Sequence, residues 1–321
     1  MPEPLRVVLA FRSDFGRHSR DLTPIREVAP QAEVVVAPDG RLTEALVADA
    51  DVLFAWVPVD LLKKARRLRW LHLPSAGADR YADRSLYAGD VIVTTSSGTF
   101  GKPIAETTIG YMLSFARNLH RYRDQQREKR WGDVPGAFEL STRTVGIIGL
   151  GDIGSEIAKR AKALGMRVVA IKRRLGPPPP YVDALWDTSG LDRLLAEADF
   201  VVLALPNTPA TRGILSAERI RRMKRGAYVC NVGRGASIDE QALIDALRDG
   251  HLGGAAIDAF TTEPLPPKSP LWEMPNVIIT PHASGRSPDN DPRRMAIFCE
   301  NLRRFVAGEP LLNVLDMDAG Y

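Results

Sequence analysis

Cysteine is scarce in this sequence, which contains two in 321 residues, Cys230 and Cys299. Two scattered thiols provide neither a disulfide framework nor a metal-binding pattern. We therefore expect no metal site, and we expect the protein to reside in a reducing compartment. Long hydrophobic runs are also missing, since no segment approaches the eighteen or so apolar residues that span a membrane. The opening residues, MPEPLRVVLAF, do not follow the pattern of a secretory signal peptide. These absences predict a soluble, cytoplasmic protein with no membrane partner.

A strong excess of one charge is missing as well. Lysine and arginine total 43 against 39 aspartates and glutamates, a formal charge of +4 at pH 7. The basic clusters at 63–69, 117–130 and 219–225 are mixed with apolar residues at helical spacing, which is typical of solvated helix faces. We therefore expect no nucleic-acid partner. The composition is otherwise that of a folded protein, and the length allows two domains with separate cores.

One segment carries three glycines in the spacing G-x-G-x-x-G, namely Gly149, Gly151 and Gly154. A β-branched run at 145–148 precedes them, an amphipathic helical pattern follows, and 167–171 is a second apolar run, which predicts strand–helix–strand. Gly149 would permit the tight turn, Gly151 would leave room for a pyrophosphate, and Gly154 would let the helix pack close to the strand. The helix N-terminus would bind the anion. The segment predicts a dinucleotide site, with a purely structural turn as the alternative.

The second strand of this segment ends in three cations, Lys172, Arg173 and Arg174. A carboxylate at this position would accept hydrogen bonds from the ribose 2′-hydroxyl of NAD, whereas cations favour the 2′-phosphate of NADP. We therefore predict that NADP(H) is preferred over NAD(H). A solvated basic turn is the alternative interpretation.

Strands and helices alternate along both halves of the chain. Short apolar runs in residues 1–100 predict one parallel sheet, and a second series of strands starts at residue 144. We interpret the glycine-rich turn at 98–103 as a hinge. A long helix with a charged extension at 121–130 follows it. The helix predicted for 293–306 has an apolar face that requires a partner, which we expect to be the first domain. The prediction is an α/β protein with two doubly wound parallel-sheet domains.

Several strands of the second series end in polar or glycine-containing turns, where doubly wound sheets bind their ligands. Four side chains at these turns suit the reduction of a 2-keto acid: Arg234, Asp258, Glu263 and His282. An arginine fork can hold a carboxylate beside the reacting carbonyl, and a histidine can supply a proton near neutral pH. Glu263 could orient His282 and stabilise its charged form. Alternatively, Arg234 is a turn residue, and Asp258 and Glu263 cap turns.

Four motifs resemble those of a known family: VGIIGLGDIG (145–154), NVGRG (231–235), IDAF…EP (257–264) and TPHASG (280–285). In this order and spacing they resemble the D-isomer-specific 2-hydroxyacid dehydrogenases. The segments LPSAGAD, GKPIAE, ALPNTPATRGIL and NLRRFVAGEPLLNV match as well, so the resemblance covers nearly the whole chain. The basic cluster after the second strand resembles the NADPH-dependent glyoxylate/hydroxypyruvate reductase-like branch.

The resemblance implies a Rossmann-type cofactor domain, 102–289, inserted into a flavodoxin-like substrate-binding domain, 1–101 plus 290–321. It also implies a homodimer, and we expect the helix after Pro103 to form the contact. The function implied is the NADPH-dependent reduction of a glyoxylate- or hydroxypyruvate-like 2-keto acid to a D-2-hydroxy acid. Two alternatives share the fold: a non-catalytic nucleotide-sensing protein like the corepressors of this family, and a phosphite dehydrogenase.

The resemblance further implies a role for each site residue. Arg234 would bind the substrate carboxylate and polarise the carbonyl, His282 would be the acid/base, and Glu263 would be its carboxylate partner. Asp258 would help to hold the nicotinamide carboxamide. Substrate binding would involve Ser75, Ala76, Gly77, Arg234 and His282. Cofactor binding would involve Gly149, Leu150, Gly151, Asp152, Ile153, Gly154, Lys172, Arg173, Arg174, Leu205, Pro206, Thr211, Val232, Gly233, Asp258 and Ser284.

Overall fold

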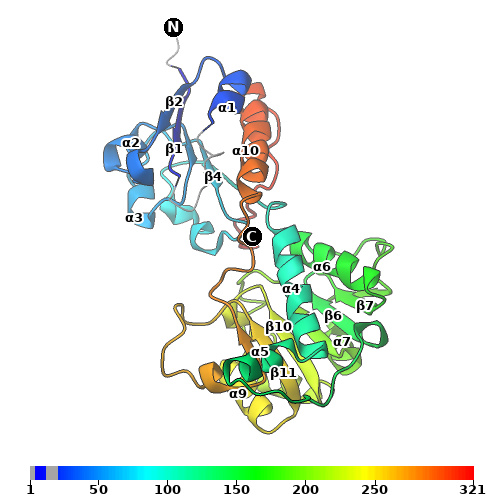
Figure 1. Ribbon diagram of the computed structural model, residues 1–321. Coiled ribbons are helices and arrows are strands. Elements are labelled where there is room, and N and C mark those ends of the chain that lie inside the picture. Colours follow the sequence, from blue (N-terminus) through cyan, green and yellow to red (C-terminus); the bar gives the residue numbers. More distant parts are fainter. Residues whose placement is uncertain (1–3, 12–20) are drawn as a thin grey trace. The chain divides into compact units, whose positions relative to one another are not determined.

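The computed structural model describes residues 4–11 and 21–321. The chain forms two compact units, which we call the first unit (Met1–Thr99 with Ser287–Tyr321) and the second unit (Phe100–Arg286). The second unit is therefore inserted into the sequence of the first (Figure 1). Residues 1–3, part of the segment considered above for a signal peptide, lie outside the described residues. Among the described residues, none of the helices combines the length and the apolar character needed to cross a membrane.

The first unit is built on a five-stranded sheet in the order β2-β1-β3-β4-β5. Neighbouring strands pair in parallel, as the predicted alternation of strands and helices requires. This strand order is that of flavodoxin-like folds. The strands are β1 (Arg6–Leu9), β2 (Glu33–Val36), β3 (Val52–Phe54), β4 (Trp70–Leu73) and β5 (Ile92–Thr95), and the helices are α1 (Thr23–Val28), α2 (Glu44–Ala48), α3 (Val59–Leu62) and α10 (Asn290–Ala307).

The last helix, α10, packs its apolar face onto this sheet. Phe298 is fully buried, and its ring stacks on Phe54 of β3 and Trp70 of β4 with centroid distances of 4.6 and 5.1 Å. Met295 and Leu302 are buried in the same cluster. Burial of each such side chain contributes about 1.5–3 kcal/mol. The predicted attachment of the C-terminal helix to the first domain is confirmed.

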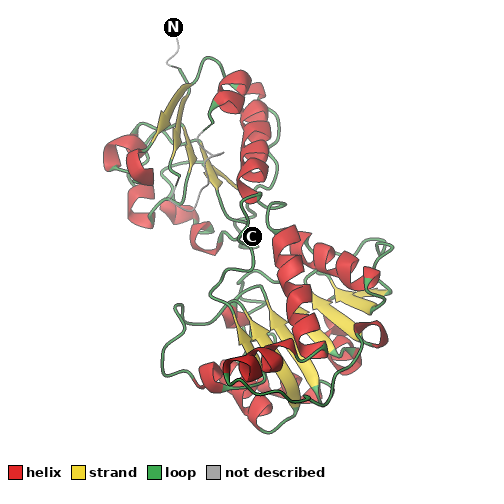
Figure 2. Cartoon of the chain, viewed as in Figure 1, coloured by secondary structure: helices red, strands yellow, loops and turns green. Residues whose placement is uncertain are grey.

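The second unit contains a seven-stranded parallel sheet in the order β12-β11-β10-β9-β6-β7-β8. The strand order reverses between β6 and β9, which is the doubly wound Rossmann arrangement. Figure 2 shows the strands of both sheets in yellow and the helices around them in red. The two sheets confirm the predicted fold class. The strands are β6 (Thr144–Ile148), β7 (Arg167–Ile171), β8 (Ala184–Trp186), β9 (Phe200–Leu203), β10 (Ala227–Asn231), β11 (Leu252–Ile257) and β12 (Val277–Ile279), and the helices are α4 (Gly101–Ala116), α5 (Leu119–Arg127), α6 (Asp152–Ala163), α7 (Leu191–Glu197), α8 (Ala217–Arg222) and α9 (Glu240–Arg248).

Two local features differ from the sequence-based expectation. The long helix expected after Pro103 is divided into α4 and α5, because Asn118 adopts a left-handed backbone with φ of +55°. Asparagine tolerates this conformation better than most residues, and its side-chain amide here donates to the Val134 carbonyl oxygen over 3.1 Å. The edge strand β8 is an additional element, whose three residues are too few to show a strand period.

His72 on β4 is a fully buried histidine in the core of the first unit. Its Nδ1 lies 2.7 Å from the Thr94 hydroxyl and its Nε2 lies 3.1 Å from the Ser96 hydroxyl. The ring also packs against Phe54 and Phe298, at centroid distances of 4.9 and 5.5 Å. Burial lowers the pKa of this imidazole from 6.5 to about 3, so the ring is neutral and has a structural role.

We expect His72 to make the first unit acid-sensitive. Because the folded protein disfavours the charged ring, the unfolded chain takes up the proton first as the pH falls below 6.5. Stability is therefore lost below this pH, by up to about 1.4 kcal/mol per pH unit. Urea unfolding at pH 7, 6 and 5 should show a shallower pH dependence for His72→Gln than for the wild type. Parallel pH dependences of the two proteins would contradict the expectation.

Candidate active site

The turn between β6 and α6 requires glycine at two of the three fingerprint positions. Gly149 has a φ of +101°, and a Cβ on it would lie 2.6 Å from the carbonyl oxygen of Ala204. A Cβ on Gly154 would overlap the carbonyl oxygen of Gly149, because the first turn of α6 passes close to the end of β6. The tight turn and the close helix–strand packing predicted for these two glycines are present.

Gly151 leaves space for a ligand at the start of α6. Among the described residues, a Cβ built on Gly151 would meet no atom within 4 Å. Gly151 is the N-cap of α6 and, as a glycine, leaves the first helical amides and the positive end of the helix dipole open to an anion. The turn therefore fits the pyrophosphate of a dinucleotide. Around it, Leu150 is a core residue, Ile153 is half-buried and Asp152 is exposed at the first helical position.

The three cations at 172–174 lie beside this glycine turn. β6 and β7 are neighbours in register, with Ile148 opposite Ile171, and the Gly149 amide donates to the Ile171 carbonyl oxygen over 3.1 Å. The cations follow Ile171 directly, and all three are exposed. A ribose phosphate belonging to a dinucleotide on the glycine turn would therefore come close to positive charge.

The cofactor-flanking residues predicted after β9 and β10 form two turns that touch each other. The hydroxyl of Thr211 donates to the carbonyl oxygen of Pro206 over 2.7 Å, which closes the first turn. In the second turn, a Cβ on Gly233 would lie 2.7 Å from the backbone nitrogen of Leu205. Val232 beside it is buried.

Asn231, the last residue of β10, holds the Arg234 turn in place. Its side-chain oxygen accepts the Gly233 amide over 3.1 Å, and its side-chain nitrogen donates to the carbonyl oxygens of Arg234 and Ala259 at 3.0 and 3.3 Å. The Arg234 guanidinium itself donates to the Gly233 carbonyl oxygen over 2.9 Å. Asn231 was not among the predicted site residues, although an amide at a strand end three residues before an arginine is a visible signal.

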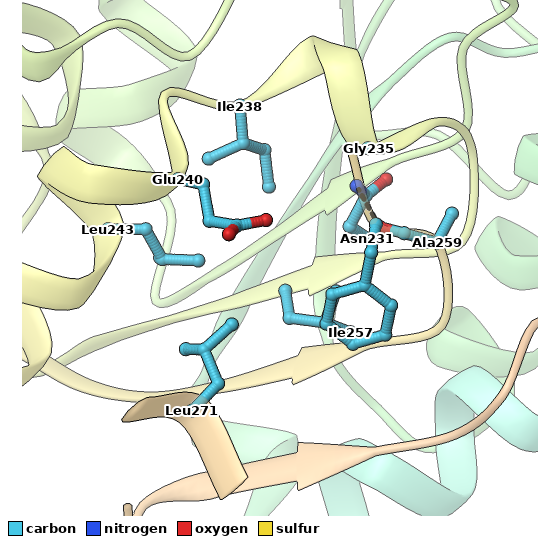
Figure 3. A pocket seen from close by; sticks show the side chains of 9 residues that line it. Asn231, Gly235, Ile238, Glu240, Leu243, Ile257, Ala259 and Leu271 are labelled. Atoms are coloured by element: carbon cyan, nitrogen blue, oxygen red, sulfur yellow. Dashed lines mark hydrogen bonds between the residues drawn. The ribbon is translucent and has the colours of Figure 1, made fainter. Parts of the chain in front are cut away.

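A small pocket lies behind the Arg234 turn, and its lining is mainly apolar (Figure 3). The figure shows the carboxylate of Glu240 among the side chains of Ile238 and Leu243. His282 and Glu263 are not among the lining residues of this pocket. The pocket therefore belongs to the packing beneath the turn and not to the group of reactive side chains.

Asp258, directly after β11, is a buried carboxylate that is 2% exposed. Its Oδ1 accepts the Thr280 hydroxyl over 2.6 Å and the Ala283 amide over 2.8 Å. Its Oδ2 accepts the Ser284 hydroxyl and, over 3.2 Å, the Ser284 amide. The carbonyl oxygen of Asp258 accepts the amide of His282 over 2.9 Å. Asp258 and Ser284, both predicted as cofactor contacts, are thus bonded to each other, and Asp258 organises the segment around His282.

His282 and Glu263 form a hydrogen-bonded pair. The Nδ1 of His282 lies 2.9 Å from Oε2 and 3.1 Å from Oε1 of Glu263, and Oε1 also accepts the amide of Phe260 over 3.0 Å. A carboxylate can only accept, so Nδ1 carries the hydrogen and Nε2 is the nitrogen that can exchange a proton with a ligand. The His282 side chain is 50% exposed, which gives a ligand access to it. His282 has a left-handed backbone, with φ of +50°.

Three neighbouring strands thus present the site side chains predicted at these turns. β10 pairs with β11, and β11 pairs with β12, in parallel. Their carboxyl ends lead to Arg234, Asp258 and His282 in turn, with Glu263 on the loop that follows Asp258. The structure brings Asp258, Glu263 and His282 into one hydrogen-bonded group, and it places Arg234 at the end of the adjacent strand.

The predicted substrate-binding residues Ser75, Ala76 and Gly77 follow β4 in the first unit. The hydroxyl of Ser75 donates to the Gly77 carbonyl oxygen over 2.8 Å and accepts the Trp56 indole N–H over 3.3 Å. The Trp56 indole therefore supports this loop. The role of Ser75, Ala76 and Gly77 in substrate binding stays a prediction.

Comparison with known proteins places this site in a family. A sequence model described as "D-isomer specific 2-hydroxyacid dehydrogenase, NAD binding domain" matches residues 109–284. The D-3-phosphoglycerate dehydrogenase of Methanocaldococcus jannaschii is 32% identical over 302 residues. That alignment covers 92% of this chain but only 57% of the relative, so the chain spans little more than half of that protein.

Two solved structures are similar over almost their whole length. A D-isomer specific 2-hydroxyacid dehydrogenase from Xanthobacter autotrophicus Py2, in complex with NADPH and MES, has a TM-score of 0.85 and 32% identity, covering 99% of this chain and 100% of that one. The NADPH-dependent glyoxylate/hydroxypyruvate reductase from Sinorhizobium meliloti, in complex with NADP and sulfate, has a TM-score of 0.84 and 29% identity, with the same coverage. The chain therefore belongs to the D-isomer-specific 2-hydroxyacid dehydrogenases, a family of NAD(P)-dependent oxidoreductases.

Proposed function

We propose that the protein reduces a small 2-keto acid of the glyoxylate or hydroxypyruvate type to a D-2-hydroxy acid, with NADPH as the cofactor. The observation that carries the proposal is the Glu263–His282 pair, which directs Nε2 of a histidine away from its carboxylate partner at the ligand-binding edge of the sheet. The similarity to the Sinorhizobium meliloti glyoxylate/hydroxypyruvate reductase supports this substrate class.

In the proposed reaction, the chain's own residues bind the substrate and supply a proton. The Arg234 guanidinium binds the substrate carboxylate and polarises the adjacent carbonyl, for which a permanently charged planar group is well suited. Nε2 of His282 donates a proton to the carbonyl oxygen as this oxygen gains negative charge. Glu263 accepts the hydrogen of Nδ1 and so keeps the ring in one orientation. The bound nicotinamide supplies the hydride.

For the cofactor, we propose three binding regions on the second unit. The amides at Gly151–Gly154 bind the pyrophosphate, and the side chains of 172–174 bind the 2′-phosphate. The turns after β9 and β10, with Leu205 and Gly233, flank the rest of the dinucleotide. The Xanthobacter autotrophicus and Sinorhizobium meliloti structures contain NADPH and NADP, respectively, which supports the choice of cofactor.

We further propose that two copies of the chain associate through α4 and α5. Leu113, Leu119 and Tyr122 on these helices are exposed large apolar side chains, which a second copy would cover. Sedimentation equilibrium should give about twice the chain mass for the wild type and a shift toward the monomer for Leu119→Glu. A wild-type monomer at micromolar concentration would contradict the proposal.

The choice of substrate and cofactor is tested by steady-state assays. NADPH oxidation is measured with glyoxylate, hydroxypyruvate, pyruvate and phenylpyruvate, followed by determination of product chirality, and NADH is tested in parallel. Turnover with a keto acid would reject the alternative that the protein only senses a nucleotide. Phosphite-dependent reduction of NAD(P) without keto-acid turnover would instead identify a phosphite dehydrogenase.

Removal of one cation from the basic cluster should weaken the binding of NADPH and spare that of NADH. Replacing Arg173 by Ala should raise the KM for NADPH about tenfold or more, since a charge-assisted hydrogen bond contributes about 1.5–3 kcal/mol, and should leave the KM for NADH nearly unchanged. Arg193→Ala is the matched control, because this guanidinium lies over the Trp186 ring in the same unit, 4.6 Å from its centroid. A wild-type preference for NADH by an order of magnitude would show that the basic turn does not select the cofactor.

Removal of the His282 imidazole should slow the chemical step and leave cofactor binding intact. His282→Ala should lower kcat by about 10²–10⁴, the usual contribution of a general acid or base. The Kd for NADPH, followed by fluorescence, should stay close to that of the wild type. His251→Ala is the control, because this second-unit histidine bonds the Ile220 carbonyl oxygen over 2.9 Å and is not part of the proposed site. Loss of NADPH binding in His282→Ala would instead indicate a structural role.

A further inference from the structure

Helix α4 contacts the His282 segment at two points. Thr107 and Tyr111 are four residues apart and therefore share one face of the helix. The Tyr111 hydroxyl lies 2.5 Å from the hydroxyl of Thr280, and the Thr107 hydroxyl donates to the carbonyl oxygen of Ser284 over 3.2 Å. Thr280 and Ser284 are two residues before and two residues after His282. One helix face thus contacts both ends of the segment.

The direction of the hydrogen bonds follows from the donors available. Asp258 is a carboxylate and can only accept, so the Thr280 hydroxyl uses its single hydrogen for Asp258 Oδ1, 2.6 Å away. Thr280 must then accept from Tyr111. Burial raises the pKa of the Tyr111 phenol, so this hydroxyl keeps its proton and can donate it. The result is a series of hydrogen bonds in one direction, in which Tyr111 donates to Thr280 and Thr280 donates to Asp258.

Such support is needed because the backbone of His282 is strained. A left-handed φ costs a residue with a Cβ about 1–2 kcal/mol and persists only where the surroundings hold it. The Glu263 carboxylate bonds the ring of His282, whereas the backbone is held by Asp258 and, through Thr280 and Ser284, by α4. Gly285, directly after this segment, also lies against the first turns of α4: a Cβ built on it would be 3.4 Å from a side-chain carbon of Ile104.

We propose that Tyr111 and Thr107 are positioning residues for the reduction: they hold the 280–284 segment on Asp258, so that His282 presents Nε2 in one orientation. The proposal deepens the function proposed above and rests on it for the role of Nε2. The bonds of Tyr111 and Thr107 lie within the second unit, so the positioning can be measured without substrate.

The test compares Tyr111→Phe and Thr107→Val with Thr108→Val. Thr108 is the matched control, because its buried hydroxyl donates to the Ile104 carbonyl oxygen within α4, over 2.7 Å. Amide hydrogen exchange is followed on peptides that cover 280–286. In Tyr111→Phe the exchange of the 282–284 amides should be about five- to tenfold faster, as expected from the loss of one buried hydrogen bond. In Thr108→Val it should not change.

The kinetic measurement separates positioning from overall stability. Tyr111→Phe should lower kcat by about five- to tenfold and change the KM for the keto acid less than twofold, because Arg234 is untouched. Unchanged local exchange and unchanged kcat in Tyr111→Phe would overturn the proposal, as would a uniform increase of exchange across the second unit. Faster local exchange in a protein that reduces no keto acid would support the positioning and reject the proposed function.

Discussion

A single buried carboxylate, that of Asp258, determines how the candidate site folds. An ionised carboxylate removed from water is tolerated only where other donors replace its hydration. The donors here are the hydroxyls of Thr280 and Ser284 and the amides of Ala283 and Ser284. All of them belong to one short segment, which therefore wraps around the carboxylate. His282 lies in the middle of this segment, with a half-exposed side chain and a left-handed backbone.

The parallel sheet decides which residues can act together. Because every strand of such a sheet ends at the same edge, side chains far apart in the sequence meet there. Arg234, Asp258 and His282 follow three adjacent strands, and the glycine turn at 149–154 follows β6 on the same edge of the second unit. The amides proposed to bind an anion and the histidine proposed to exchange a proton therefore lie at one edge. The opposite edge carries the helix-to-strand connections.

The apolar run expected at 167–171 is enough to predict β7, whose observed bounds, Arg167–Ile171, equal the expected ones. The motif positions likewise indicate that Glu263 and His282 belong together. The contacts of Tyr111 are not visible in the sequence, because this residue fits the apolar face of its helix and a hydroxyl leaves no periodic signal. The break at Asn118 is hidden for a related reason: a single left-handed residue interrupts a helix without changing its composition.

The orientation of the imidazole depends on two supports that act on different parts of His282. Glu263 fixes the ring through Nδ1, and the hydrogen bonds to Asp258 fix the backbone. With only the first support, the strained backbone would relax and carry the ring with it, since φ of +50° is unfavourable for a histidine. With only the second, the ring would sample other rotamers. Each support therefore has its full effect only while the other is intact. The buried hydrogen bonds beneath α4 are thereby coupled to the orientation of Nε2, the nitrogen proposed to exchange a proton.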